Sequence, residues 1–268
     1  MIKLIASDVD GTLIQDSTPN LYKEMVETIH ELKKKGILFC AASGRQYFSL
    51  RNVFREVADE IAYIAENGAH IRYQNKNISV TPMKKEYIEG ILAMLRPYYG
   101  ECETVISTAG GSLIESRNRE FIDLLTYGYH NHFKLVDDVL KEKEEIIKIA
   151  VYRRESIRKL GEGSFIPAWE NKVKACMAGE EWVDFMDASV DKGNGLKVLE
   201  DYLGIRKEET MAFGDNNNDI GMMLAAGTSY AVDTAVDEVK KAADHVCPGW
   251  RDKGVYRIIK QKIFEGID

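Results

Sequence analysis

The stretch Leu4-Ile5-Ala6-Ser7-Asp8-Val9-Asp10-Gly11-Thr12 joins an apolar run to two carboxylates and a glycine near the start of a 268-residue chain. We predict that residues 2–7 form a buried strand and that the chain turns at Gly11. Asp8 and Asp10 then lie at the carboxyl end of that strand. One carboxylate there can attack an electrophile while the other transfers a proton, and both can help to hold a hard cation.

Strand and helix patterns alternate over the next part of the chain. The expected elements are a helix over 21–35 that ends at Gly36, a strand over 37–42, a helix after the turn at 43–45, and a strand over 61–65 that ends in the turn 66–68. Near-continuous apolar strands separated by helices predict an α/β fold with a Rossmann-like parallel-sheet core.

The pattern changes at about residue 83 and returns near residue 186. Between them we expect a helix over 86–95, a solvated helix end at 141–145, and strands at 104–107, 112–115, 146–152, 173–177 and 182–186. Afterwards we expect a helix over 195–203, a strand over 210–213, a helix around 222–224, and strands over 229–232 and 245–246. The sequence thus predicts a discontinuous core (1–82 and 186–268) with an inserted α/β domain (83–185).

Composition narrows the class of protein. Hydrophobic residues make up 45% and charged residues 29% of the chain, and the net charge is -7, which argues against nonspecific binding of nucleic acid. No apolar run approaches the roughly 20 residues that span a bilayer. The first strand begins at once, leaving no room for a signal peptide, and the four cysteines form no close pair. We therefore expect a cytoplasmic protein with reduced thiols.

Polar residues that suit one kind of chemistry are predicted at the carboxyl ends of the core strands, where open parallel sheets bind ligands. These residues are Asp8 and Asp10, Ser43 and Gly44, Lys192, and Asp215, Asn218 and Asp219. Carboxylates that converge there repel one another unless a cation lies among them, and an oxygen-only ligand set favours Mg²⁺ over zinc. A lysine and a hydroxyl group at the same place suit a phosphoryl group.

Each of these residues has a structural explanation when taken alone. Ser43-Gly44 can start a helix, Lys192 can be a solvated surface lysine, and residues 216–218 can form a turn. Asp219 can cap the following helix instead of supporting a metal. Their joint order favours the functional interpretation. His130 and His132 share a strand face but lack an evident third ligand, which makes a metal site there a weak hypothesis.

The chain resembles the haloacid dehalogenase-like superfamily, and more narrowly its Cof-type (subfamily IIB) sugar-phosphate phosphatases. The resemblance covers nearly the whole chain and is weakest between about 83 and 170. It rests on four motifs in the family's order: Asp8-Val9-Asp10-Gly11-Thr12, Ser43-Gly44-Arg45, Asp191-Lys192-Gly193 and Gly214-Asp215-Asn216-Asn217-Asn218-Asp219. The stretches 66–69 and 237–244 support the same branch.

The resemblance implies a Mg²⁺-dependent phosphatase that acts on small phosphomonoesters, such as sugar phosphates or phosphorylated cofactors. Asp8 is then the nucleophile that forms an aspartyl-phosphate, and Asp10 is the acid and base. The implied metal ligands are Asp8, the Asp10 backbone carbonyl and Asp215, supported by Asp219. The implied phosphoryl-binding groups are Ser43, Lys192, Asn218 and backbone amides near Val9 and Gly44. The inserted domain corresponds to the family's cap, which closes over the site and selects the leaving group.

Several alternatives stay open at this point. A phosphomutase uses the same intermediate but returns the phosphoryl group to a bound sugar. A signalling receiver also combines an acidic cluster, a hydroxyl and a lysine on a parallel sheet, although the second Asp and the long insertion argue against it. Arg45 either contacts substrate or pairs with a core carboxylate, and Asn67 is expected to stabilise its turn. The sequence leaves the particular ester and the oligomeric state undetermined.

Overall fold

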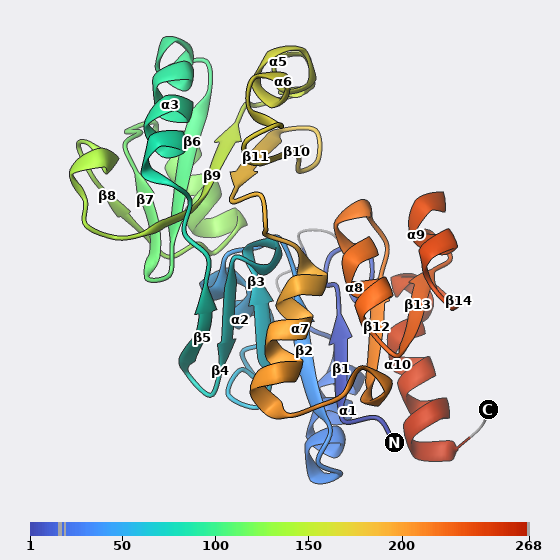
Figure 1. The fold of residues 1–268 in the computed structure, drawn as a ribbon. Coiled ribbons are helices and arrows are strands. Elements are labelled where there is room, and N and C mark those ends of the chain that lie inside the picture. The colour runs from blue at the N-terminus through green and yellow to red at the C-terminus, as the bar shows by residue number, and fades with distance from the viewer. Residues whose placement is uncertain (16–17, 19, 267–268) are drawn as a thin grey trace. The chain divides into compact units, whose positions relative to one another are not determined.

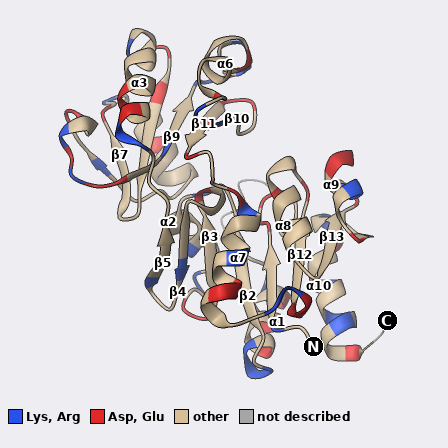
Figure 2. Ribbon diagram, in the orientation of Figure 1, with Lys and Arg blue, Asp and Glu red and all other residues tan. Residues whose placement is uncertain are grey.

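The computed structural model describes residues 1–15, 18 and 20–266, and divides the chain into two compact units. Unit 1 contains Met1–Ser79 and Asp191–Asp268, and unit 2 contains Val80–Val190. Figure 1 shows unit 1 at both ends of the colour range, because segments from the two ends of the chain build it together. Along the ribbons of both units, Lys and Arg are interspersed with Asp and Glu (Figure 2).

Unit 1 is built on an eight-stranded sheet with the order β14-β13-β12-β1-β2-β3-β4-β5. The strands are β1 (Leu4–Ser7), β2 (Leu38–Ala42), β3 (Ala62–Ala65), β4 (His70–Tyr73), β5 (Lys76–Val80), β12 (Thr210–Gly214), β13 (Thr228–Val232) and β14 (His245–Cys247). Every pair from β14 through β3 is parallel. The predicted α/β fold with a parallel-sheet core is therefore confirmed.

The register of the central strands determines where the polar motifs meet. Ser7, the last residue of β1, lies opposite Ala41 of β2 and Phe213 of β12. Strands that run parallel and end at the same level bring their following loops to one edge of the sheet. The loops after β1, β2 and β12 are consequently neighbours, although they are distant in sequence.

Helices cover both faces of this sheet. They are α1 (Lys23–Lys34), α2 (Tyr47–Val53), α7 (Lys192–Leu203), α8 (Ile220–Ala225), α9 (Asp237–Ala242) and α10 (Gly254–Ile259). Helices α7 and α8 pack against each other on the face that is in front in Figure 1. Helix α1 forms because Met25, Ile29 and Leu32 recur at helical spacing and are buried. Burial of this apolar stripe, rather than intrinsic propensity, supplies most of the helix's stability.

Two details of unit 1 differ from the sequence expectation. The hairpin β4–β5 extends the sheet beyond β3, with β4 antiparallel to β3. It escapes prediction because its strands are partly polar and its two-residue turn is Gln74–Asn75, an unusual pair with φ of 49° and 60°. Lys192 was expected at the carboxyl end of a core strand, which is wrong: it is the first residue of α7.

The early start of α7 has a local cause. Asp191 is its N-cap, and its Oδ1 accepts hydrogen bonds from the backbone N–H groups of Gly193 and Asn194 at 2.7 and 3.4 Å. An acidic N-cap satisfies helix-terminal donors and is favoured by the helix dipole. The helix therefore begins three residues before the expected Gly195.

Unit 2 has a six-stranded sheet with the order β10-β11-β9-β6-β7-β8. Its strands are β6 (Glu103–Thr108), β7 (Gly111–Ile114), β8 (Phe133–Leu135), β9 (Ile146–Tyr152), β10 (Lys174–Met177) and β11 (Trp182–Met186), and its helices are α3 (Lys85–Leu95), α4 (Arg119–Asp123), α5 (Arg158–Leu160) and α6 (Ile166–Trp169). Two buried apolar clusters belong to this unit alone. Unit 2 thus has its own hydrophobic core.

The helix end expected at residues 141–145 is wrong. The structure has one 3₁₀ turn, Val139–Lys141, which Asp138 caps by accepting from the Leu140 N–H at 3.1 Å. The run of Lys and Glu that follows has no apolar stripe to bury, so nothing extends the turn. No helix in the described part of the chain is long and apolar enough to cross a membrane. The four cysteines are free thiols.

Candidate active site

Asp8 follows the last residue of β1 and lies between the ends of the central strands. The Asp8 backbone N–H donates to the Phe213 carbonyl of β12 at 2.9 Å, and the Gly11 N–H donates to the Ile14 carbonyl at 2.9 Å. Gly11 has φ of +84°, and a Cβ there would lie 2.4 Å from Oδ2 of Asp215. Only glycine combines this backbone conformation with so close an approach. The glycine of the first motif therefore makes room for the acidic residue of the last.

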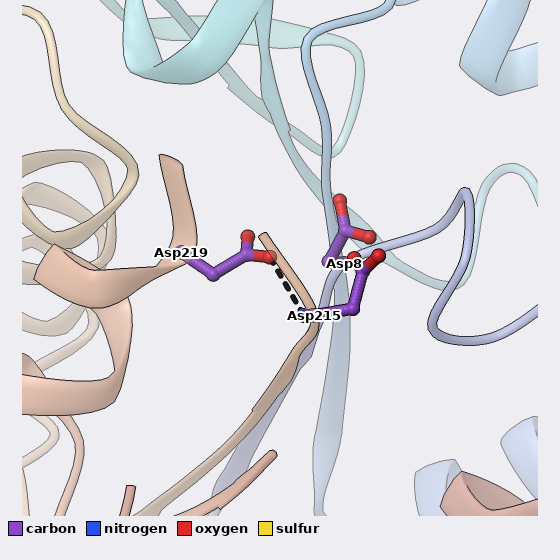
Figure 3. A group of neighbouring side chains, drawn as sticks. All are labelled: Asp8, Asp215 and Asp219. Atoms are coloured by element: carbon purple, nitrogen blue, oxygen red, sulfur yellow. Dashed lines mark hydrogen bonds between the residues drawn. The ribbon is translucent and has the colours of Figure 1, made fainter. Parts of the chain in front are cut away.

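Three carboxylates converge at this edge of the sheet, Asp8 from the loop after β1 and the other two from the loop after β12. Asp8, Asp215 and Asp219 each place an oxygen within 4.8 Å of the others. Figure 3 shows the Asp8 and Asp215 side chains close together, and Asp219 reaching toward them from the start of the neighbouring helix. Asp215 is held by Thr12, whose Oγ1 donates to Asp215 Oδ1 at 3.0 Å. The first and last motifs are thereby joined directly.

Lys192 lies inside this cluster and is fully buried. Its Nζ donates to Oδ1 of Asp8 at 2.6 Å and to Oδ1 of Asp219 at 2.7 Å. Burial disfavours the ammonium form, but these two carboxylates outweigh burial and raise the pKa of Lys192. The alternative of a solvated surface lysine is wrong, because the ammonium group is enclosed between two carboxylates.

Burial shifts the pKa of the carboxyl groups in the direction opposite to its effect on the lysine. Burial raises the pKa of Asp8 well above its ordinary value. Lys192 opposes this rise, while the neighbouring carboxylates add to it. Burial, followed by the charge of Asp219, also raises the pKa of Asp215. The cluster has too much negative charge for its buried position, a condition that a cation would relieve.

Asp219 completes the cap of the 3₁₀ turn Asn217–Asp219 rather than capping the helix that follows, α8. Its Oδ2 accepts hydrogen bonds from the backbone N–H groups of Asp215 and Asn216 at 2.9 and 3.0 Å, the first of which is dashed in Figure 3. Its Oδ1 is occupied by Lys192. No side-chain cap bond to α8 is formed. Asp219 therefore orients the carboxylate-bearing loop and the lysine together.

The cluster fits a divalent metal ion. Asp8 Oδ2 is buried and has no hydrogen-bond partner among the described residues, although buried carboxylate oxygens normally have one. The three clustered side chains offer carboxylate oxygens, which suit a hard cation. Asp8 and Asp215 are the side chains best placed to bind it. Within the described ranges, no histidine belongs to such a group, so the suggestion of a metal at His130 and His132 has no support.

The loop after β2 forms the second side of the site. Ser43 is buried, and its Oγ accepts from the Arg45 backbone N–H at 3.1 Å. A Cβ on Gly44 would lie 3.2 Å from the side-chain amide of Asn67. Asn67 Oδ1 in turn accepts from Nδ2 of Asn218 at 2.9 Å. The Asn67 backbone N–H also donates to the Ser43 carbonyl at 2.9 Å, so Asn67 connects the loop of residues 43 and 44 with Asn218.

Asn67 makes a long-range side-chain contact that sequence reasoning missed. It was expected to stabilise its own turn, and it does lie in a turn, with φ of 57° between Glu66 at 50° and Gly68 at 105°. Its side chain nevertheless contacts a residue 151 positions away. A run of residues with left-handed backbone conformation costs conformational free energy and is common in functional loops. The sequence Glu-Asn-Gly indicates a turn but does not specify this conformation.

Two further predicted residues have clear positions. Arg45 pairs with Asp10: its Nε donates to Oδ2 at 2.6 Å and its Nη2 donates to Oδ1. Of the two open alternatives for Arg45, the structure therefore shows pairing with a core carboxylate. Val9 is fully buried, and its carbonyl accepts from the N–H groups of Leu13 and Ile14. These bonds close the tight loop that carries Asp8 and Asp10.

Comparison with known proteins agrees with this arrangement. The chain belongs to the haloacid dehalogenase-like hydrolase family, because the sequence model of that family matches residues 5–259. It is 27% identical over 260 residues to the 5-amino-6-(5-phospho-D-ribitylamino)uracil phosphatase YbjI of Escherichia coli, covering 96% of this chain and 95% of that protein.

Solved structures show the same fold. The crystal structure of a protein from Eubacterium rectale superimposes with a TM-score of 0.87 at 34% sequence identity. The match covers 98% of this chain and 99% of that protein's chain. The HAD subclass IIB sugar phosphatase BT4131 has a TM-score of 0.81 at 23% identity, covering 97% of this chain and 98% of its own. The predicted family is confirmed, and the named relatives support the predicted class of enzyme, a phosphatase, over a signalling receiver.

Proposed function

We propose that this protein is a Mg²⁺-dependent phosphatase that hydrolyses small phosphomonoesters through an aspartyl-phosphate on Asp8. The observation that carries the proposal is the buried cluster of Asp8, Asp215 and Lys192, in which one Asp8 oxygen has no protein partner among the described residues. Asp8 and Asp215 would hold the metal ion together with the Asp10 backbone carbonyl. The ion would neutralise charge that develops on the phosphoryl oxygens.

In the first step, an Asp8 carboxylate oxygen forms a bond to phosphorus while the bond from phosphorus to the leaving oxygen breaks. Asp10 gives its proton to that oxygen, so that a neutral alcohol departs. Lys192 contacts Asp8 directly and places positive charge beside the phosphoryl group. Ser43 and Asn218 are proposed to bind the equatorial oxygens.

In the second step, Asp10 takes a proton from water, and the water oxygen attacks phosphorus. The bond between phosphorus and Asp8 breaks, which releases inorganic phosphate and restores the carboxylate. Asp10 serves as acid and then as base without net change. Unit 2 is proposed to be the cap that selects the leaving group, as the resemblance implies.

The substrate class follows from the relatives' names. One relative is named for a phosphorylated ribityl compound and one structural neighbour is a sugar phosphatase. We therefore propose polyol and sugar phosphates as the first esters to test.

The test is phosphate release from a panel of such esters by wild type and by Asp8→Asn, each with Mg²⁺ and with chelator. Release that requires both Asp8 and Mg²⁺ is the expected result. Full turnover by Asp8→Asn would contradict the nucleophile assignment. An isomerised ester in place of free phosphate would identify a phosphomutase.

A further inference from the structure

The contact between Asp10 and Arg45 assigns a role to a residue outside the carboxylate cluster. We propose that Arg45 is a positioning residue that holds the carboxyl group of Asp10 in one orientation for proton transfer. This inference rests on the proposed function, in which Asp10 protonates the leaving oxygen. It replaces the alternative in which Arg45 contacts the substrate.

The geometry of the pair is that of a fork. Two different nitrogens of one guanidinium group donate to the two oxygens of one carboxylate, Nε to Oδ2 and Nη2 to Oδ1. Two parallel hydrogen bonds restrict the rotation of the carboxyl plane as well as its position, whereas a lysine ammonium acts as a point charge. Arg45 therefore supplies orientation that no other cation of similar reach would supply.

The backbone on both sides of the pair is anchored. The Arg45 N–H donates to Ser43 Oγ at 3.1 Å, and the Arg45 carbonyl accepts from the Glu66 N–H at 3.0 Å. The residue after Asp10, Gly11, donates to Ile14 at 2.9 Å. The ion pair thus links two fixed loops that follow neighbouring strands, β1 and β2. A guanidinium group held in this way can hold another side chain in place.

The pair is not sealed from a ligand. The side chain of Arg45 is 16% exposed and that of Asp10 is 27% exposed, in contrast to 8% for Asp8. A proton-transfer group must come within hydrogen-bond reach of the reacting oxygen. The exposure of Asp10 permits this, and its pairing with Arg45 limits the directions that the carboxyl group samples.

Leaving-group chemistry separates this role from direct substrate contact. An alkoxide leaves phosphorus poorly without a proton, whereas p-nitrophenolate leaves as a stable anion. Loss of Asp10 positioning should therefore slow alkyl phosphates selectively. A lost contact to the phosphoryl group, which both esters share, should slow them equally. The ratio kcat/KM is the appropriate quantity, because it reports the steps up to departure of the leaving group.

The experiment compares wild type, Arg45→Gln, Arg45→Lys, Asp10→Asn and the double variant Arg45→Gln/Asp10→Asn. Each is assayed with p-nitrophenyl phosphate and with the best alkyl phosphate of the panel. For the alkyl ester, we expect kcat/KM to fall about 100-fold or more in Asp10→Asn, the usual contribution of acid–base catalysis. We expect kcat/KM for the alkyl ester to fall about tenfold in Arg45→Gln, because the Asp10 carboxyl group is then less well placed. For p-nitrophenyl phosphate, we expect kcat/KM to change by less than about threefold in either single variant.

The double variant gives the decisive comparison. If Arg45 acts only through Asp10, Arg45→Gln/Asp10→Asn is no worse than Asp10→Asn, since coupled residues are non-additive. A full further loss in the double variant, or an equal loss on both esters, would overturn the proposal. Arg51→Gln is the matched control. It removes another Arg–Asp pair close by in the sequence, between Arg51 and Asp59, and neither residue belongs to the proposed site.

Folding is checked by thermal denaturation of every variant. If Arg45→Gln does not fold, Arg45→Lys carries the test, because it keeps the charge and loses the fork. We expect Arg45→Lys to show the same selective loss to a smaller degree, and full wild-type activity in Arg45→Lys would overturn the role of the fork. Failure of the proposed function itself has a different signature, namely no release by wild type, or release that persists in Asp8→Asn.

Discussion

At the scale of single residues, the cluster around Asp8 is arranged for chemistry at the expense of stability. Burial raises the pKa of Asp8, so the folded protein binds that proton more tightly than the unfolded chain does. Ionising Asp8 above its ordinary pKa therefore costs folding free energy, and the cost grows with pH until the raised pKa is reached. Sites that need charge in a buried position commonly carry such a cost.

We predict that Asp8→Asn is at least as heat-stable as wild type in the presence of chelator. Asparagine is nearly isosteric and does not ionise, so it avoids the burial cost. The Tm difference should be positive at about pH 7 and shrink toward zero at about pH 4, where the ordinary carboxyl group also takes up its proton. Thermal denaturation at several pH values measures this. A lower Tm for Asp8→Asn at neutral pH would show that its bond to Lys192 outweighs burial.

A second prediction concerns Asn67. Because Asn67 has φ of 57°, Asn67→Gly keeps the backbone turn and removes only the side chain that accepts from Asn218. We expect Tm to change little and KM to rise about fivefold, the worth of roughly one hydrogen bond. Steady-state kinetics with the best ester of the panel checks this. Asn67→Ala, which strains the turn, should lower Tm as well. Unchanged KM in Asn67→Gly would mean that Asn218 needs no support.

The sequence predicts those candidate site residues that stand in short local motifs, and it does not predict contacts between distant loops. Asp8, Asp10 and Asp215 stand in short motifs after strands, and their placement at strand ends was predictable. The partners of Arg45 and Asn67 were not, because each bond depends on how distant loops meet. The Asn67–Asn218 bond spans 151 positions, and no local pattern of either residue specifies it.

At the scale of elements, the start of α7 is positioned by unusually close packing against α8. A Cβ on Gly193 would lie 2.3 Å from the carbonyl carbon and oxygen of Gly221. Lys192 precedes Gly193 and is the first residue of the helix. The distance between two helices therefore sets the distance between the lysine and the carboxylates. The sequence predicted a helix here, but not its first turn, because the capping role of Asp191 was not recognised.

We predict that Gly193→Ala moves α7 away from α8 and displaces Lys192. Overpacking of this kind costs about 1–3 kcal/mol of stability. A displacement of roughly 1 Å should lower kcat/KM about 10- to 100-fold. Thermal denaturation and phosphate release measure the two effects. Gly163→Ala is the matched control, since a Cβ there meets no heavy atom within 4 Å. Equal behaviour of the two variants would show that the helix contact has no influence on the lysine.

At the scale of the whole molecule, alternation of apolar strands and helices predicted the parallel core and its assembly from both ends of the chain. The β4–β5 hairpin was missed, since its strands carry polar residues and pair only at the sheet edge. The separate apolar clusters of unit 1 and unit 2 have a thermodynamic consequence. Units that bury their own cores can unfold in separate transitions. A ligand bound within one unit then stabilises that unit in particular.

We predict that Mg²⁺ raises the unfolding temperature of unit 1 more than that of unit 2. The three tryptophans permit the test, because Trp250 lies in unit 1, and Trp169 and Trp182 lie in unit 2. Trp169→Phe/Trp182→Phe leaves a fluorescence reporter in unit 1, and Trp250→Phe leaves reporters in unit 2.

At 100 times its Kd, Mg²⁺ should stabilise unit 1 by about 2.7 kcal/mol, a rise in Tm of several degrees. Asp215→Asn, which removes a proposed ligand, should abolish most of this shift in the unit 1 reporter. Equal shifts from both reporters would instead mean that the two units unfold as one cooperative block, so that metal bound at the carboxylate cluster stabilises the entire chain.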